Sequence, residues 1–95
     1  MLNKILPTFF CGTAIKITSV FNIDTPTTAT VTVKNPSTLP VVNEANMDKE
    51  DNGVYSYILQ TALGWSEGDY VVTVQITYGG YTSVTQQKFT LIRQE

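Results

Sequence analysis

The sequence predicts an all-β sandwich, and three observations support this prediction. Two segments, residues 28–34 and 69–78, alternate strictly between apolar and polar side chains. The chain contains 15 threonines, and β-branched residues fit a pleated strand better than a helical turn. No segment sustains the 3.6-residue period of an amphipathic helix. The chain is therefore expected to consist of half-buried strands.

The alternating segments also predict the core. In residues 69–78 every second side chain is large and apolar, and residues 28–34 place alanine and valines on one face. Residues 14–21 and 54–59 show a similar alternation, with Ile15, Ile17, Tyr55, Tyr57 and Leu59 expected to face inward. The predicted core comprises Val31, Val33, Tyr70, Val72, Val74, Ile76, Phe89 and Leu91.

Turn residues separate the strands. Gly79-Gly80 lies between two alternating runs and predicts a hairpin with a type I′ turn. Pro36 and Pro26 are expected to end the strands before them, and the polar run 48–53 is expected to form a turn. The predicted strands span residues 14–22, 28–35, 39–44, 53–61, 69–78 and 81–92, with a short extra strand at 45–48. Six or seven short strands at this spacing favour a sandwich over a barrel.

Length and composition indicate one domain without the residues of the commonest catalytic sites. The chain has 95 residues and a net charge of −2, with residues 1–12 expected to form an extended arm before a domain at 13–95. Its six Lys and Arg residues are too few and too scattered for a nucleic-acid footprint. It has no histidine, which removes the commonest general base and metal ligand. We expect no enzyme activity, no cofactor and no small-molecule substrate.

The single cysteine and the start of the chain bear on its compartment. Cys11 has no cysteine partner within the chain, which favours assembly in a reducing cytoplasm. Pro7 interrupts the apolar residues near the start, so we expect no secretory signal. No stretch of 18 apolar residues is present, so no membrane span is expected.

An acidic run resembles the beginning of a calcium loop. Asp48, Glu50 and Asn52 alternate before Gly53, but the twelfth position from Asp48 is Leu59 and not the glutamate that an EF-hand requires. Weak calcium binding at Asp48–Asn52 stays open beside the simpler interpretation of a solvated turn. The close carboxylate pairs, Glu50/Asp51 and Glu67/Asp69, are also expected in solvated loops.

The segment before the strand at 69–78 indicates a structural role. Gly68 lies two residues before Tyr70, which is typical of the tyrosine corner of Greek-key sandwiches, where the hydroxyl bonds back to the chain. Trp65 is then expected to cover the end of the core. The alternative is that Trp65 forms an exposed platform on which a sugar or a base stacks.

The arm contains four large apolar residues that a free terminus would leave in water. Ile5, Leu6, Phe9 and Phe10 precede the first expected strand of the domain. Exposure costs roughly 1.5–3 kcal/mol for each such side chain. The arm is therefore expected either to fold back as an edge strand or to dock on another subunit, and docking is preferred because the other strands already close a core.

The order of these features, from Ile15 to Leu91, resembles a family of small immunoglobulin-like proteins encoded by tailed bacteriophages. The shared features are a first strand such as residues 14–18, the Thr/Val strand ending in Asn35-Pro36, the segments 53–57 and 65–74, the Gly79-Gly80 hairpin and residues 88–91. The apolar arm departs from the polar entry typical of the family. The resemblance implies an immunoglobulin-like antiparallel β-sandwich.

The resemblance also implies a structural role in the virion. The expected function is a capsid decoration or other accessory subunit that is assembled in the host cytoplasm. Its partner is then a capsid or tail subunit, or copies of itself, and neither a nucleic acid nor a membrane. Ile5, Leu6, Phe9 and Phe10 are the expected partner contacts. A module that binds a cell-surface glycan through its loops, with Trp65 as the platform, is the alternative.

Overall fold

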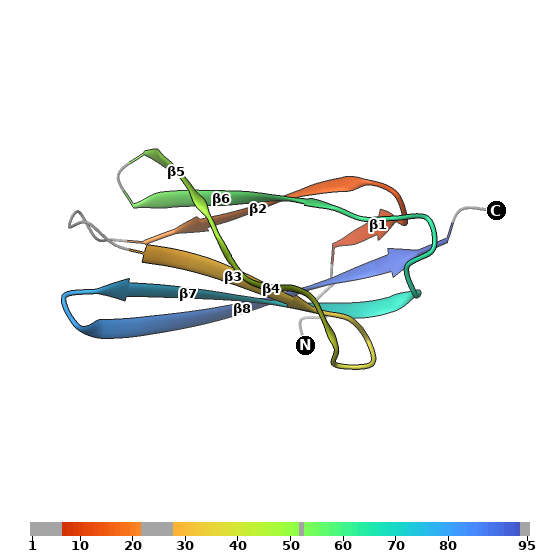
Figure 1. Cartoon of the computed structure of the whole chain (residues 1–95). Coiled ribbons are helices and arrows are strands. Elements are labelled where there is room, and N and C mark those ends of the chain that lie inside the picture. The colour runs from red at the N-terminus through yellow and green to blue at the C-terminus, as the bar shows by residue number, and fades with distance from the viewer. Residues whose placement is uncertain (1–6, 22–27, 52, 94–95) are drawn as a thin grey trace, which may run out of the picture.

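The computed structural model describes residues 7–21, 28–51 and 53–93, which form two packed β-sheets (Figure 1). The strands are β1 (Thr8–Phe10), β2 (Ala14–Val20), β3 (Thr28–Lys34), β4 (Pro40–Asn46), β5 (Asp48–Asp51), β6 (Val54–Gln60), β7 (Gly68–Tyr78) and β8 (Tyr81–Ile92). The prediction of an all-β sandwich is confirmed. In this part of the chain no helix is long and apolar enough to cross a membrane.

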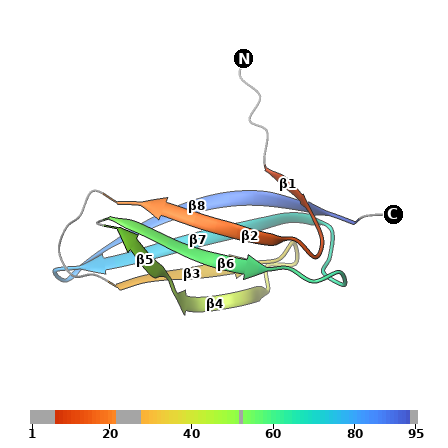
Figure 2. The ribbon, with the colours of Figure 1, turned by 90° about the horizontal axis from the view of Figure 1, so that it is seen from above.

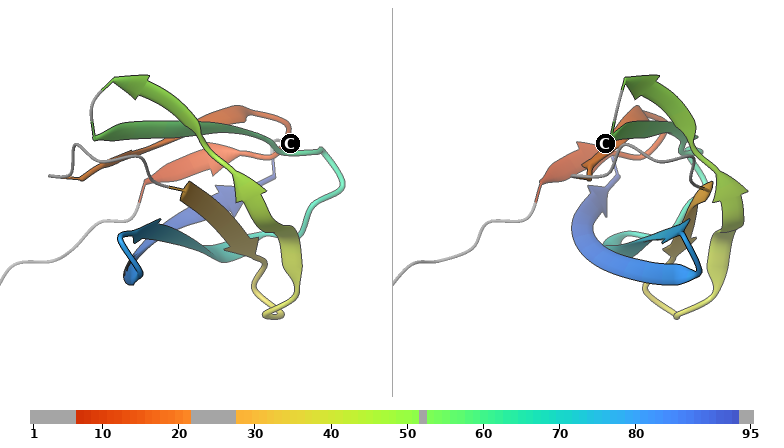
Figure 3. Two further views of the ribbon diagram at one scale, coloured as in Figure 1. Left: turned by 60° about the vertical axis from the view of Figure 1, so that its left-hand side comes forward. Right: turned by 90° about the vertical axis from the view of Figure 1, so that its left-hand side faces the viewer.

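The two sheets differ in size and lie face to face. The larger sheet has the strand order β1-β8-β7-β3-β4, and the smaller sheet has the order β2-β6-β5. Figure 3 shows the smaller sheet stacked over the larger one. Seen from above, β1 lies beside β8 at one edge and β4 lies at the other (Figure 2). Neighbouring strands run antiparallel, except that β1 and β8 are parallel.

The core lies between the sheets, where the alternating strands predicted it. Each of the eight predicted core residues is at most 4% exposed, so that prediction is confirmed. Strands β3 and β7 pair without a register shift from Thr28–Thr77 to Lys34–Val71, which aligns their apolar faces. In the smaller sheet, Ile15, Ile17, Tyr55 and Leu59 are buried as expected, whereas Tyr57 is half-buried.

The hairpin between β7 and β8 has the geometry that its glycines predict. Gly79 and Gly80 have φ angles of 51° and 82°, and Tyr78 pairs with Tyr81 across the turn. Positive φ at both central residues is the requirement of a type I′ turn. The turn sets a register that continues without a shift to Gly68 and Leu91.

The turn after β3 is stabilised by the side chain of Asn35. Its Oδ1 accepts hydrogen bonds from the backbone N–H groups of Ser37 at 2.9 Å and Leu39 at 3.0 Å. Pro36, in the same turn, lies against the start of β7, where Gly68 has a φ of 132°. The predicted end of the strand near Pro36 is therefore confirmed, and the turn also shapes the entry to β7.

Two predictions between residues 44 and 53 are wrong. The extra strand is not at 45–48, because β4 continues to Asn46 and a separate strand, β5, begins at Asp48. Met47 separates them: its side chain is buried, and its N–H donates to the Ala29 carbonyl oxygen at 2.9 Å. This anchor lets the chain pass from the larger sheet to the smaller one. The polar run 48–51 is accordingly a strand paired with β6, and not a turn.

At the end of β2 the strand stops at Val20, two residues before the predicted limit, which is an ordinary difference at a strand terminus. The predicted stop at Pro26 and position Asn52 of the acidic run lie outside the described residues.

Candidate functional site

Residues 8–10 of the arm form an edge strand of their own domain. Strand β1 pairs in parallel with β8, with Phe9 opposite Leu91 and Phe10 opposite Ile92. The pairing is flanked by two backbone hydrogen bonds, from Thr90 N–H to the Pro7 carbonyl at 2.8 Å and from Cys11 N–H to the Ile92 carbonyl at 2.9 Å. For these residues the structure shows the folded-back edge strand, the less preferred of the two arrangements expected from the sequence. Ile5 and Leu6 lie outside the described residues.

Phe9 and Phe10 point to opposite faces of this strand. Phe9 packs against the core, where its ring meets the Phe89 ring edge to face at a centroid distance of 6.1 Å. Phe10 is 47% exposed. Cys11, the next residue, is 4% exposed and belongs to the core. The arm is thus attached to the domain through Phe9 and Cys11, and Phe10 remains available to a partner.

A row of aromatic rings connects the arm with the loop before β7. Tyr70 stacks on Phe89 at a centroid distance of 5.2 Å, and Trp65 stacks on Tyr70 at 5.8 Å. The Tyr70 hydroxyl donates to the Ser66 carbonyl at 2.8 Å, the bond back to the chain that the sequence predicts. Because Tyr70 covers one face of the indole, these contacts support the core-covering role of Trp65.

Three exposed apolar side chains lie at the end of the sandwich where the arm joins it: Phe10, Leu63 and Ile92, here called the apolar end. Phe10 and Ile92 are register partners on the outer face of the larger sheet. Leu63 belongs to the loop between β6 and β7 and lies against Gly12, the last residue of the arm. Figure 1 shows β1, this loop and the end of β8 at the same end of the molecule. A partner that docks at this end would contact exposed apolar side chains from three separate segments.

Of these three residues, the sequence predicted only Phe10 as a partner contact. Ile92 follows the buried Leu91, so the alternation of β8 already places its side chain on the outer face. Leu63 lies in a loop, where no local pattern in the sequence indicates which strand a side chain will lie beside. The Leu63 side chain is 76% exposed.

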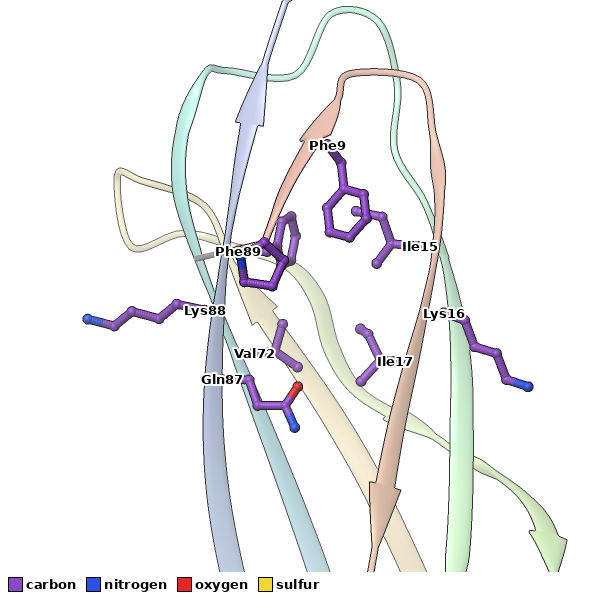
Figure 4. A pocket seen from close by; sticks show the side chains of 9 residues that line it. Phe9, Ile15, Lys16, Ile17, Val72, Gln87, Lys88 and Phe89 are labelled. Carbon is purple, nitrogen blue, oxygen red and sulfur yellow. The ribbon is translucent and has the colours of Figure 1, made fainter. Parts of the chain in front are cut away.

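A pocket of about 100 Å³ opens between β2 and β8 beside the arm (Figure 4). Most of its walls are apolar side chains, including Phe9, Ile17 and Val72. The lysines at its rim, Lys16 and Lys88, point away from it (Figure 4). This lining suits an apolar side chain better than a charged ligand.

Residues 48–51 of the acidic run form strand β5, which pairs with β6, and Glu50 of this run forms an ion pair. The Glu50 carboxylate accepts from the Lys16 Nζ at 2.8 Å, across the smaller sheet. Hydrogen bonds from Lys16 and Ser56 lower the pKa of Glu50 below its ordinary value of 4.5. Within residues 7–21, 28–51 and 53–93, no three His, Cys, Asp or Glu side chains are arranged to hold a metal ion. Glu50 thus forms an exposed ion pair with Lys16.

The other carboxylate pair, Glu67 and Asp69, holds the end of β8. Glu67 Oε2 accepts from the backbone N–H of Arg93 at 2.7 Å, and Asp69 Oδ1 accepts from the Thr90 hydroxyl at 2.8 Å. These contacts join the entry of β7 to the last residues of β8, next to the apolar end. They give both carboxylates a structural role.

Comparison of the sequence with protein-family models and with curated proteins found no match.

Proposed function

We propose that the fold is immunoglobulin-like. The order β2-β6-β5 in one sheet and β8-β7-β3-β4 in the other matches the two sheets of an immunoglobulin sandwich, B-E-D facing G-F-C-C′. In such a sandwich the tyrosine corner lies at the start of the F strand. Tyr70 occupies the corresponding position of β7, and its hydroxyl bonds to Ser66. The position two residues later is Val72 here, where antibody domains have a cysteine.

We further propose that the protein is a non-enzymatic structural subunit of a bacteriophage virion, such as a capsid decoration or another accessory protein. The virion setting comes from the resemblance described above. The structural observation that supports docking is the apolar end, where Phe10, Leu63 and Ile92 are exposed beside the arm. A capsid or tail subunit is the proposed partner, and assembly in the host cytoplasm is the proposed route.

The apolar end has the composition expected of a docking site. Phe10 is a large aromatic residue anchored by its strand, and aromatic anchors dominate the binding energy of many interfaces. The residues on either side of Phe10 are held to β8 by backbone hydrogen bonds, so little conformational entropy of the backbone is lost when a partner binds. Ile5 and Leu6, which precede this surface in the sequence, are proposed to extend the contact.

The experiment is mass spectrometry of purified virions from the phage or prophage whose genome encodes this sequence. The proposal expects the polypeptide at a copy number that is a fixed ratio to the major capsid or tail protein. Absence of the polypeptide from particles, with the protein present in the infected cell, would contradict it.

The glycan-binding alternative has less support. Trp65 is half-buried, stacks on Tyr70 and packs against the core cluster, so its ring is only partly available to a sugar. A glycan array separates the alternatives directly. Binding that is lost in Trp65→Ala and retained in Phe10→Ala would favour the glycan module.

A further inference from the structure

The outer edge of β8 has two parts with different surroundings. Along its length, β8 pairs with β7 on one side. On its other side, among the residues that the structure describes, only Thr90–Ile92 pairs, with β1. The backbone of Thr90 and Ile92 points toward β1. Because backbone groups alternate along a strand, Thr82, Val84, Gln86 and Lys88 direct theirs to this same outer edge.

Pro7 lies immediately before the first residue of β1, Thr8. In the parallel ladder the carbonyl of residue 7 accepts from Thr90, and the N–H of residue 7 would donate to the Lys88 carbonyl. Proline has no such N–H. The ladder therefore loses a bond at Lys88, and the segment 81–88 lies beyond the last paired residue of β1.

The edge strands β2, β4 and β5 have features that discourage pairing with another chain. Strand β4 begins with Pro40 and has register shifts against β3. Strand β5 is four residues long, and all four are charged. Strand β2 has Lys16 at its third position, held by Glu50. Short length, charge, proline and bulges are the devices by which native sheets avoid edge-to-edge association.

Residues 81–88 of β8 have none of these features except the charge of Lys88 at one end. Their register with β7 shows no shift, and Val84, near the centre, is 57% exposed. Figure 1 shows this part of the β7–β8 hairpin at the end of the molecule remote from β1. It is a regular and accessible edge of eight residues.

We propose that two copies of the chain associate through this edge, with their β8 strands antiparallel about a two-fold axis at Val84. Val84 then lies opposite Val84 of the second copy, and Thr82 lies opposite Gln86. The two five-stranded sheets become one sheet of ten strands. The dimer leaves the apolar end free and does not depend on the virion setting.

The edge is complementary to itself in both hydrogen bonding and charge. Thr82, Val84 and Gln86 meet strand residues of the second copy that direct their backbone groups to the same edge, and the central pair is apolar. Each Lys88 lies opposite Gly80 of the second copy, so the two lysines are ~27 Å apart along the strands. That separation is well beyond the Debye length of about 8 Å at physiological salt. A second copy therefore fits the edge without opposing like charges.

The test compares Val84→Lys with Gln75→Lys in the full chain by sedimentation velocity over a range of concentrations. Val84 and Gln75 are partners across β7 and β8, so both variants add one charge to the same sheet face. In the dimer the two introduced lysines are about 5.5 Å apart at position 84, and about 14 Å apart at position 75. The expected result is a dimer whose dissociation constant rises about tenfold or more in Val84→Lys and is nearly unchanged in Gln75→Lys.

Hydrogen exchange identifies the edge independently of the variants. The amides of Thr82, Val84 and Gln86 are expected to exchange rapidly in dilute protein and slowly at concentrations that favour the dimer. The amides of Ser83 and Thr85, which face β7, should be protected in both. A chain that stays monomeric at all concentrations would overturn the proposal, as would a dimer that both variants leave intact. Protection of the outward amides that persists on dilution and is lost when residues 1–6 are removed would also overturn it, because the chain's own arm would then cover the edge.

Discussion

The Tyr70 hydroxyl donates a hydrogen bond to the Ser66 carbonyl oxygen at 2.8 Å, which closes the loop that leads from β6 into β7. The Tyr70 ring lies in the core, between Trp65 and Phe89. The Tyr70 hydroxyl thus holds the loop in place, and the Tyr70 ring packs in the core. The loop that it fixes contains Leu63 of the apolar end, so this contact links the stability of the fold to the proposed docking surface.

Replacement of Tyr70 by phenylalanine is expected to lower the free energy of unfolding by about 1 kcal/mol, because the Ser66 carbonyl loses its partner while the ring stays in place. Burial, with a smaller contribution from Cys11, raises the pKa of the Tyr70 hydroxyl above its ordinary value of 10.0. Above that value the unfolded chain releases a proton that the folded chain retains, so stability falls as pH rises. Urea denaturation at neutral and alkaline pH should show this fall in the native protein and a smaller one in the variant; an equal slope in both would contradict the assignment.

Gly68 is required where the loop enters β7. Its φ is 132°, and a Cβ at this position would lie 2.8 Å from the Pro36 Cγ. Gly68→Ala is therefore expected to cost about 1–3 kcal/mol in the free energy of unfolding. The matched control is Gly64→Ala, since a Cβ there meets nothing within 4 Å, and its effect should stay within about 0.5 kcal/mol. Equal melting temperatures for the two variants would show that the close approach of Gly68 to Pro36 does not affect the stability of the protein.

Val74 tests the core. It is 1% exposed in the centre of β7, and Val74→Ala should destabilise the protein by about 1–3 kcal/mol through lost burial and the cavity that remains. Gln75→Ala, at the next and exposed position of the same strand, should change the stability by less than about 0.5 kcal/mol. Chemical denaturation of both variants gives the comparison, and a larger effect at Gln75 would be inconsistent with the described packing.

Two shortened chains test whether β1 is an integral strand of the domain. A chain that begins at Pro7 keeps β1 and its hydrogen bonds to β8, so it should remain folded. A chain that begins at Gly12 loses the buried Cys11 and the contact between Phe9 and Phe89, and should be less stable by about 2–4 kcal/mol. Thermal unfolding by circular dichroism measures both. If the shorter chain is as stable as the longer one, β1 is not an integral strand.

Local patterns in the sequence were sufficient to predict most of the sandwich. The alternation in residues 69–78 gave the inward face of β7, and Gly79-Gly80 gave the hairpin and its register. Both signals are local, because side-chain direction and turn type depend on residues adjacent in the chain. The bond from the Tyr70 hydroxyl back to the chain was also predicted, because Gly68, two residues before Tyr70, indicates a tyrosine corner. Trp65 was expected to cover the end of the core, but its stacking on Tyr70 was not predicted.

The errors concern contacts between residues far apart in the sequence. The run 48–51 is rich in charge and favours a turn by composition, but pairing with β6 and the ion pair between Glu50 and Lys16 make it a strand. The pairing of residues 8–10 with their own domain was left open beside docking on another subunit, because no local pattern shows that β8 has a free edge for them. The apolar end was identified only in part, since Leu63 joins Phe10 and Ile92 through tertiary structure.

The most direct test of the proposed docking role is the incorporation of Phe10→Asp and Val20→Asp proteins into virions that lack the native polypeptide. Both substitutions place a carboxylate at an exposed apolar position, but Phe10 lies at the apolar end and Val20 ends β2, toward the opposite end of the sandwich. We expect Phe10→Asp to be incorporated about tenfold less than the native protein, and Val20→Asp to be incorporated normally. Normal incorporation of Phe10→Asp would contradict docking through the apolar end.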